Sequence, residues 1–320
     1  MFSSQEQESL KRQSLSAEQV ERLIVGLDSL VEGALGVSLL IACGEDAIPP
    51  LRRFLLFGSP RSIYVGRQRA VKALSGLNAA SVLMEYLLLE KQIHDPIVRY
   101  SEEAVESTAA RELAKWKTEE VFKALLTILK RKPLPGAVEA IGVFQRKEAV
   151  PGLIRCLEDD VARPLAEGAL LALRELAKVE LIATTRLPEP WASRELASSL
   201  LRRRSALRIL VSGRVTAAEW EQLRFLMFDR DPTLSLRAAG LALAMAAQPD
   251  ISLATRITID RLCAKDWFVV AEAEQILLEN FDLTCSAVET EITRQGQLHD
   301  VGSKKVVAIL KAIARCGEAA

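Results

Sequence analysis

Hydrophobic residues recur at spacings of three and four along almost the whole chain. In segment 47–57, Ile48, Leu51 and Leu55 fall on one stripe, and segments 121–129 and 150–157 repeat this spacing. Such a stripe indicates an amphipathic helix whose apolar side faces a core. No segment alternates apolar and polar residues over the length of a strand, and no Asn-Gly or Asp-Gly pair marks a hairpin. The sequence therefore predicts an all-α fold.

The predicted helices form pairs that repeat along the chain. The first helices are expected to begin near residues 47, 80, 119, 149, 217, 253 and 286, and the second helices to span 65–77, 96–116, 133–144, 162–177, 190–212, 232–247, 266–280 and 301–314. One interval, from 149 to 217, is about twice the others, so a degenerate repeat is expected at 180–212. Because a helical pair cannot bury both of its faces alone, such pairs are expected to stack in a row.

Two turns between paired helices carry a capping signal. Asp95-Pro96 and Asp231-Pro232 each place an aspartate at the N-cap and a proline at the first helical position. The second helices that follow are rich in Ala, Gly and Leu, which allows close helix packing.

These turns and helices resemble the HEAT-repeat family. The resemblance rests on Asp231-Pro232 with the second-helix segments 237–239 and 241–243, and on Val150-Pro151 and Ile48-Pro49 in first helices. It covers about 47–315 and implies a right-handed α-α superhelix, a HEAT-like solenoid of about seven to eight helical hairpins, with a first helix that bends at its proline. Armadillo-type stacking is the close alternative.

The resemblance also implies a structural ladder and a domain division. In HEAT-like stacks an arginine after the turn reaches the turn aspartate of its own or of the next repeat, so Asp95 and Asp231 are the expected partners of Arg99 and Arg237. Residues 1–16 are expected to be a disordered or loosely helical tail, and residues 17–320 a single solenoid whose N-terminal cap is 17–44.

Composition and charge narrow the function classes. The chain has 320 residues, of which 49% are hydrophobic and 26% charged, and this excludes a mainly disordered chain. Lys+Arg and Asp+Glu both number 42, so a uniformly basic nucleic-acid-binding surface is not expected. No apolar run approaches the roughly 20 residues of a membrane span, and we expect a cytoplasmic protein without a membrane partner.

Few residues suggest chemistry. Five cysteines without CxxC spacing argue against a disulfide framework and a zinc site. The two histidines, His94 and His299, are interpreted as turn residues, and adjacent acids such as Glu102-Glu103 as solvated or helix-terminal charges. No nucleotide-binding, metalloprotease or hydrolase motif occurs. We therefore predict no catalytic residue, no metal site and no cofactor.

The predicted partner-binding residues lie around the degenerate repeat. They are Trp191, in a proline-rich break, and four arginines that follow it: Arg202, Arg203, Arg204 and Arg208. Arg204 and Arg208 share one helical face and could hold an acidic partner, or they could form a solvated face that pairs with carboxylates such as Glu195. Trp267, which heads an apolar run, is expected in the core.

The predicted function is that of a non-catalytic scaffold or adaptor that binds a protein partner on the concave surface of the stack. Two alternatives remain: a nucleic-acid-binding protein similar to HEAT-like alkylation glycosylases, and a protein similar to HEAT-like phycobilin lyases. The sequence predicts neither the partner's identity nor the oligomeric state.

Overall fold

The computed structural model describes residues 16–187, 195–297 and 301–317. All regular elements in these ranges are helices, so the predicted all-α fold is confirmed for this part of the chain. None of these helices combines the length and the apolar character that a bilayer crossing requires. The chain divides into two compact units, residues 1–173 (unit 1) and 174–320 (unit 2).

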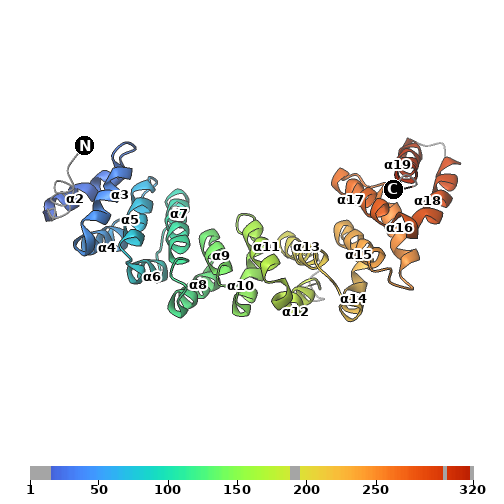
Figure 1. The fold of residues 1–320 in the computed structure, drawn as a ribbon. Helices are drawn as coiled ribbons and strands as arrows, with labels where there is room; N and C mark the ends of the chain where they lie inside the picture. The colour runs from blue at the N-terminus through green and yellow to red at the C-terminus, as the bar shows by residue number, and fades with distance from the viewer. Residues whose placement is uncertain (1–15, 188–194, 298–300, 318–320) are drawn as a thin grey trace, which may run out of the picture. The chain divides into compact units, whose positions relative to one another are not determined.

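The described part of unit 1 contains five helical pairs in sequence order (Figure 1). The first helices of the pairs are α2 (Ala17–Val25), α4 (Ile48–Phe57), α6 (Ala80–Leu88), α8 (Glu119–Arg131) and α10 (Val150–Cys156). The second helices are α3 (Gly33–Ala42), α5 (Val65–Gly76), α7 (Pro96–Leu113), α9 (Pro135–Gly142) and α11 (Arg163–Ala172). The pair predicted at 17–44 is thus present as α2 and α3.

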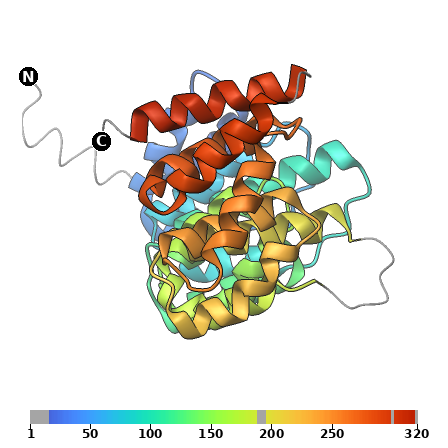
Figure 2. The same ribbon diagram turned by 90° about the vertical axis from the view of Figure 1, so that its right-hand side faces the viewer.

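Unit 2 continues with four pairs in its described part. The first helices are α12 (Arg174–Thr184), α14 (Ala217–Leu223), α16 (Ile251–Arg261) and α18 (Phe281–Gly296). The second helices are α13 (Ala197–Val211), α15 (Pro232–Ala244), α17 (Trp267–Glu279) and α19 (Val301–Gly317). A 3-10 helix, η4 (Arg224–Phe228), extends α14. Figure 2 shows the last pair, α18 and α19, side by side in red.

Within each unit, second helices pack against second helices in chain order. In unit 1, α3 contacts α5, α5 contacts α7, α7 contacts α9 and α9 contacts α11. In unit 2, α13, α15, α17 and α19 form the corresponding series. In unit 1 the first helices also contact one another in chain order, from α2 through α4, α6 and α8 to α10. Each unit therefore has a layer of second helices that contact one another in chain order.

Local sequence fixes where the second helices begin. Asp95 accepts hydrogen bonds from the backbone N–H groups of Ile97 (2.8 Å) and Val98 (3.2 Å), and Asp231 accepts one from Leu234 (3.0 Å). Both predicted N-caps are confirmed, with the following proline in the first turn. Each cap satisfies backbone donors that the helix itself leaves unpaired.

Small residues set the spacing between second helices. A Cβ on Gly136 of α9 would lie 2.0 Å from the carbonyl oxygen of Ser107 on α7, so only glycine allows this approach. The α7–α9 contact is therefore a backbone-to-backbone contact.

Two expectations about the helices need correction. The second helix predicted at 162–177 ends at Ala172, because Leu173 leaves the helical conformation (φ −97°, ψ 6°), and α12 begins at Arg174 as the first helix of the next pair. The prolines of α4 and α10 do not bend a continuous helix. Pro49 and Pro151 lie in the first turn, directly after the 3-10 helices η2 (Gly44–Ala47) and η3 (Lys147–Ala149), where a missing N–H costs no helical hydrogen bond.

Candidate partner-binding surfaces

The second-helix layer of unit 1 is hollowed between α7 and α9. This α7–α9 hollow has a volume of about 500 Å³. Tyr100 and Val161, both largely exposed, give it an apolar surface next to the buried Leu134, while Glu103 and Arg111 add charge. The remaining lining residues are Gln68, Ala104, Ser107, Lys132, Pro133, Pro135 and Asp159.

The second-helix layer of unit 2 has a hollow of the same kind. The α15–α17 hollow has a volume of about 680 Å³. Leu241, Met245 and Ile276 supply its apolar surface, and Arg237 pairs across it with Glu272, with 2.7 Å between Nε and Oε1. The remaining lining residues are Val211, Gly213, Arg214, Val215, Gly240, Ala244, Gln275, Glu279 and Asn280. Both hollows thus combine apolar side chains with charges of both signs.

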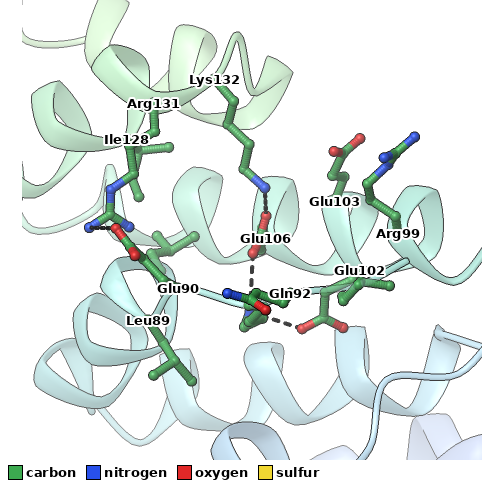
Figure 3. Close-up of a pocket in the computed structure, with 13 residues that line it drawn as sticks. Leu89, Glu90, Gln92, Arg99, Glu102, Glu103, Glu106, Ile128, Arg131 and Lys132 are labelled. Atoms are coloured by element: carbon green, nitrogen blue, oxygen red, sulfur yellow. Dashed lines mark hydrogen bonds and ion pairs between the residues drawn. The ribbon is translucent and has the colours of Figure 1, made fainter. Parts of the chain in front are cut away.

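A third cavity of about 580 Å³ lies between α6, α7 and α8, and an ionic cluster forms its floor (Figure 3). Its centre is Glu102, which is 2% exposed. One oxygen of Glu102 accepts hydrogen bonds from Arg67 Nη2 (2.9 Å) and from the Tyr86 hydroxyl (2.7 Å), and lies 2.9 Å from Lys91 Nζ. Lys91 also donates to Glu106 (3.1 Å).

The electrostatics of this cluster shift the pKa of Glu102 and that of Tyr86 in opposite directions. Burial alone would raise the pKa of Glu102, but the nearby Lys91 and Arg67 charges and the Tyr86 hydrogen bond outweigh it and lower that pKa. Burial, reinforced by the negative charge of Glu102, raises the pKa of Tyr86 well above its usual range. Lys91 Nζ also lies 3.5 Å from the centre of the Tyr86 ring, a favourable cation–π contact.

This cluster corrects the interpretation of Glu102-Glu103 as solvated charges, because Glu102 is buried. Arg67 ties the cluster to the end of α4, where it donates to the carbonyl oxygens of Leu55 (2.8 Å), Phe54 (3.1 Å) and Gly58 (3.2 Å). Since each cluster carboxylate already accepts from cationic side chains, the arrangement is suited to fixing α4, α6 and α7 together rather than to transferring protons.

The four arginines predicted to bind a partner do not form one exposed patch, because their burial differs. Arg203 is 0% exposed and therefore does not lie on a partner surface. It donates to the carbonyl oxygen of Thr185 (2.8 Å) and to Glu195 (2.8 Å), and it pairs with Asp229. Arg204 forms a bidentate ion pair with Asp231. Its Nε lies 3.0 Å from Oδ1, and its Nη2 contacts Oδ2.

Of the two other arginines, Arg202 is half-buried and Arg208 is exposed on α13. Trp191 lies outside the described residues, as does His299. His94 lies in the connection between α6 and α7 and is exposed.

The predicted ladder has other partners than expected. Asp231 pairs with Arg204 of the preceding second helix, and Arg237 pairs with Glu272 of the following one. Asp95 caps α7, while Arg99 is exposed at the mouth of the cavity in Figure 3. Arginine pairs therefore link successive second helices from α13 to α17, but the aspartate at the turn is not the partner of the arginine that follows it.

The expectation that Trp267 lies in the core is wrong. Its side chain is 66% exposed and stacks on Phe268, with ring centres 3.8 Å apart. Trp220 is buried instead, and its indole N–H donates to Asp250 (3.0 Å).

No group of acids, histidines or cysteines among the described residues is arranged to hold a metal ion. No model of a known protein family matches the chain. No curated protein shows significant similarity to it.

Proposed function

We propose that this chain is a non-catalytic scaffold of HEAT-like repeats that binds a segment of a protein partner along the layer of second helices. The observation that carries the proposal is the ordered packing of second helices in each unit, with a hollow on that layer in both units. A layer of this kind offers a long surface at fixed spacing, which suits an extended or helical segment of another protein.

The lining of the two hollows supports a protein partner. Apolar side chains such as Tyr100 and Ile276 stand beside charges of both signs such as Arg111 and Glu272. Interfaces between proteins have this composition, with apolar anchors and a polar rim. A polyanion would instead need an excess of unpaired positive charge.

The arginine pairing weakens the nucleic-acid alternative. The basic segment that motivated it contains Arg203, which is buried, and Arg204, which is paired with Asp231. No residue favours a phycobilin-lyase-like activity.

We infer that the pairs form a HEAT-like, right-handed superhelix over 17–320 in which the second helices line the concave side. The inter-helix arginine pairs and the close α7–α9 approach support regular stacking within each unit.

Site-specific photo-crosslinking tests the proposed binding layer. A photoreactive phenylalanine analogue would replace Tyr100 in the α7–α9 hollow or Gln275 in the α15–α17 hollow, with Lys123 on the first helix α8 as the matched control. Irradiation in lysate of the source organism should give a defined protein adduct from the hollow positions and not from residue 123. Adducts from position 123 alone, or from none of the three in a folded chain, would overturn the proposal.

A further inference from the structure

Most of the highly exposed aromatic side chains lie at junctions between the two helices of a pair. Among the described residues, five aromatic side chains are at least 65% exposed: Phe57, Tyr100, Phe228, Trp267 and Phe268. Four of them lie where the first helix of a pair gives way to the second, and Tyr100 lies in the second turn of the second helix α7. Unit 2 holds three of them in two successive junctions, and we call Phe228, Trp267 and Phe268 the aromatic edge.

The two junctions that form the aromatic edge are neighbours in space. The helices that follow them, α15 and α17, pack against each other. Arg204 senses the charges of both Asp231, which caps α15, and Asp266, which caps α17. Phe228 lies just before α15, and the stacked pair formed by Trp267 and Phe268 lies at the start of α17, so packed neighbouring helices carry exposed aromatic side chains at or just before their first turns.

Two basic residues flank this surface. Arg230 follows Phe228 by two residues and Lys265 precedes Trp267 by two. Both are exposed, and within the described ranges neither forms an ion pair, in contrast to the paired arginines of the second-helix layer. The aromatic edge thus combines large apolar side chains with unpaired positive charge.

We propose that the aromatic edge is a second docking site, separate from the second-helix hollows, for a protein segment in which aromatic or aliphatic residues are flanked by Asp or Glu. Aromatic anchors in such a site supply most of the binding energy, and surrounding charges set selectivity. A segment of this composition places its apolar side chains on the rings and its carboxylates near Arg230 and Lys265.

A lipid surface or a nucleic acid fits this edge less well. Asp266 is exposed directly beside Trp267 and would face anionic headgroups or phosphates at close range. Such juxtaposition of like charges opposes binding to a polyanion, whereas a peptide can place a backbone N–H or a polar side chain there.

Selection of random twelve-residue peptides by phage display on the full chain tests the proposal. Enriched peptides should carry aromatic or aliphatic residues flanked by acids. A synthetic copy should shift the tryptophan fluorescence to shorter wavelength as water leaves the Trp267 indole. Trp267→Ala should weaken its binding about 30-fold, as for an anchor residue, and the double variant Arg230→Glu/Lys265→Glu about tenfold.

Matched controls lie in the same unit. Val179→Ser removes an exposed apolar side chain on α12, and Arg256→Glu reverses an exposed charge on α16. Both should leave peptide affinity unchanged, and circular dichroism should show that all variants remain helical.

Three results would overturn the aromatic edge as a docking site. They are a selection that enriches no peptide, enriched peptides without acids, and enriched peptides that bind the Trp267→Ala variant equally well. Binding of phosphatidylglycerol vesicles or of a thymidine 20-mer in place of peptides would also overturn it. Because the hollows lie elsewhere, crosslinks from positions 100 and 275 would still support the proposed scaffold if the edge failed.

Discussion

In its described part, each unit buries one arginine of a second helix, Arg67 in unit 1 and Arg203 in unit 2. Both act in a similar way. Arg67 donates to the carbonyl oxygen of Leu55 in its own first helix, α4, and Arg203 donates to Thr185, which directly follows its own first helix, α12. Each arginine also reaches a carboxylate in the next pair. A single side chain thus joins the two helices of one pair to the following pair.

The two arginines differ in what surrounds the carboxylate. In unit 1 the deeply buried Glu102 is shared by Arg67, Tyr86 and Lys91, so one anion supports three partners. In unit 2 the buried cation Arg203 is shared by two carboxylates, Glu195 and Asp229. We therefore expect the stability of unit 1 to depend on the shared anion Glu102 and that of unit 2 on the shared cation Arg203.

Removal of the shared anion should give the largest effect in unit 1. Glu102→Ala leaves Arg67 and Lys91 buried without their central carboxylate, and we expect the free energy of unfolding of unit 1 to fall by about 3–5 kcal/mol. Asp229→Ala should cost only about 1–3 kcal/mol, because Arg203 keeps Glu195 and Thr185. Hydrogen exchange of α5, α7, α13 and α15 in each variant measures the two effects separately. Equal losses in the two units would contradict the asymmetry.

Two glycine substitutions in unit 1 test helix packing independently of the ionic cluster. Gly136→Ala forces α7 and α9 apart, because its Cβ would overlap the Ser107 carbonyl, and should cost about 1–3 kcal/mol or more. Gly168→Ala on α11 meets nothing within 4 Å and should stabilise the chain by up to about 1 kcal/mol through helix propensity. Urea unfolding of both variants tests this pair, and a neutral Gly136→Ala would show that the close approach is not required.

The pH dependence of unit 1 should reflect its buried anion. The lowered pKa of Glu102 means that its stabilisation is complete above the unfolded value of about 4.3 and is lost as the pH falls through the lower folded value. The raised pKa of Tyr86 means that its contribution is complete below about 10 and is lost as the pH rises further.

Variants of the two groups check these signs. Glu102→Gln should flatten the acid limb of unit 1 stability, and Tyr86→Phe should flatten the alkaline limb while costing about 1–2 kcal/mol at neutral pH from the lost hydrogen bond. Thermal unfolding across pH measures both. An acid limb that is unchanged in Glu102→Gln would show that other carboxylates control it.

The smallest effect is expected for a partly exposed arginine. Arg204 is 34% exposed and pairs with the buried Asp231, and Arg204→Ala should cost only about 1 kcal/mol because Asp231 keeps its hydrogen bond from the Leu234 N–H. Arg203→Ala, one residue away, should cost about 3–5 kcal/mol because it leaves buried carboxylates without a cation. Similar losses for the two variants, measured by urea unfolding, would contradict the distinction between the fully buried and the partly exposed arginine.

Much of the helical layout could be predicted from the sequence, because caps and periodicity are local signals. Asp95-Pro96 and Asp231-Pro232 start helices where expected. The end of α11 was missed because no glycine or proline marks Leu173, and apolar periodicity continues into α12. Only packing against neighbouring pairs separates these two helices.

The local sequence around Arg203 indicates its burial, although the neighbouring arginines suggest an exposed basic patch. Arg203 lies three, four and seven residues before Ala206, Leu207 and Leu210, so it occupies the apolar stripe of α13. Its partners could not be predicted, since Asp229 is 26 residues away along the chain. The Glu102 cluster is hidden for the same reason, because Arg67 lies 35 residues from Glu102.

The exposure of Trp267 follows from its position in the first turn of α17. Side chains of a helix tilt toward its N-terminus, so those of the first turn extend beyond the helix end instead of covering a preceding turn. Val269 and Val270, a little further along, are buried. The apolar run indicated burial correctly for its later members only.

Small-angle X-ray scattering of the full chain tests the proposed superhelix most directly, in which the helical pairs would stack in one row. A compact globule of 320 residues has a radius of gyration of roughly 20 Å. The proposed superhelix predicts a clearly larger value and the pair-distance distribution of an elongated particle. A value near 20 Å with a symmetric distribution would contradict it.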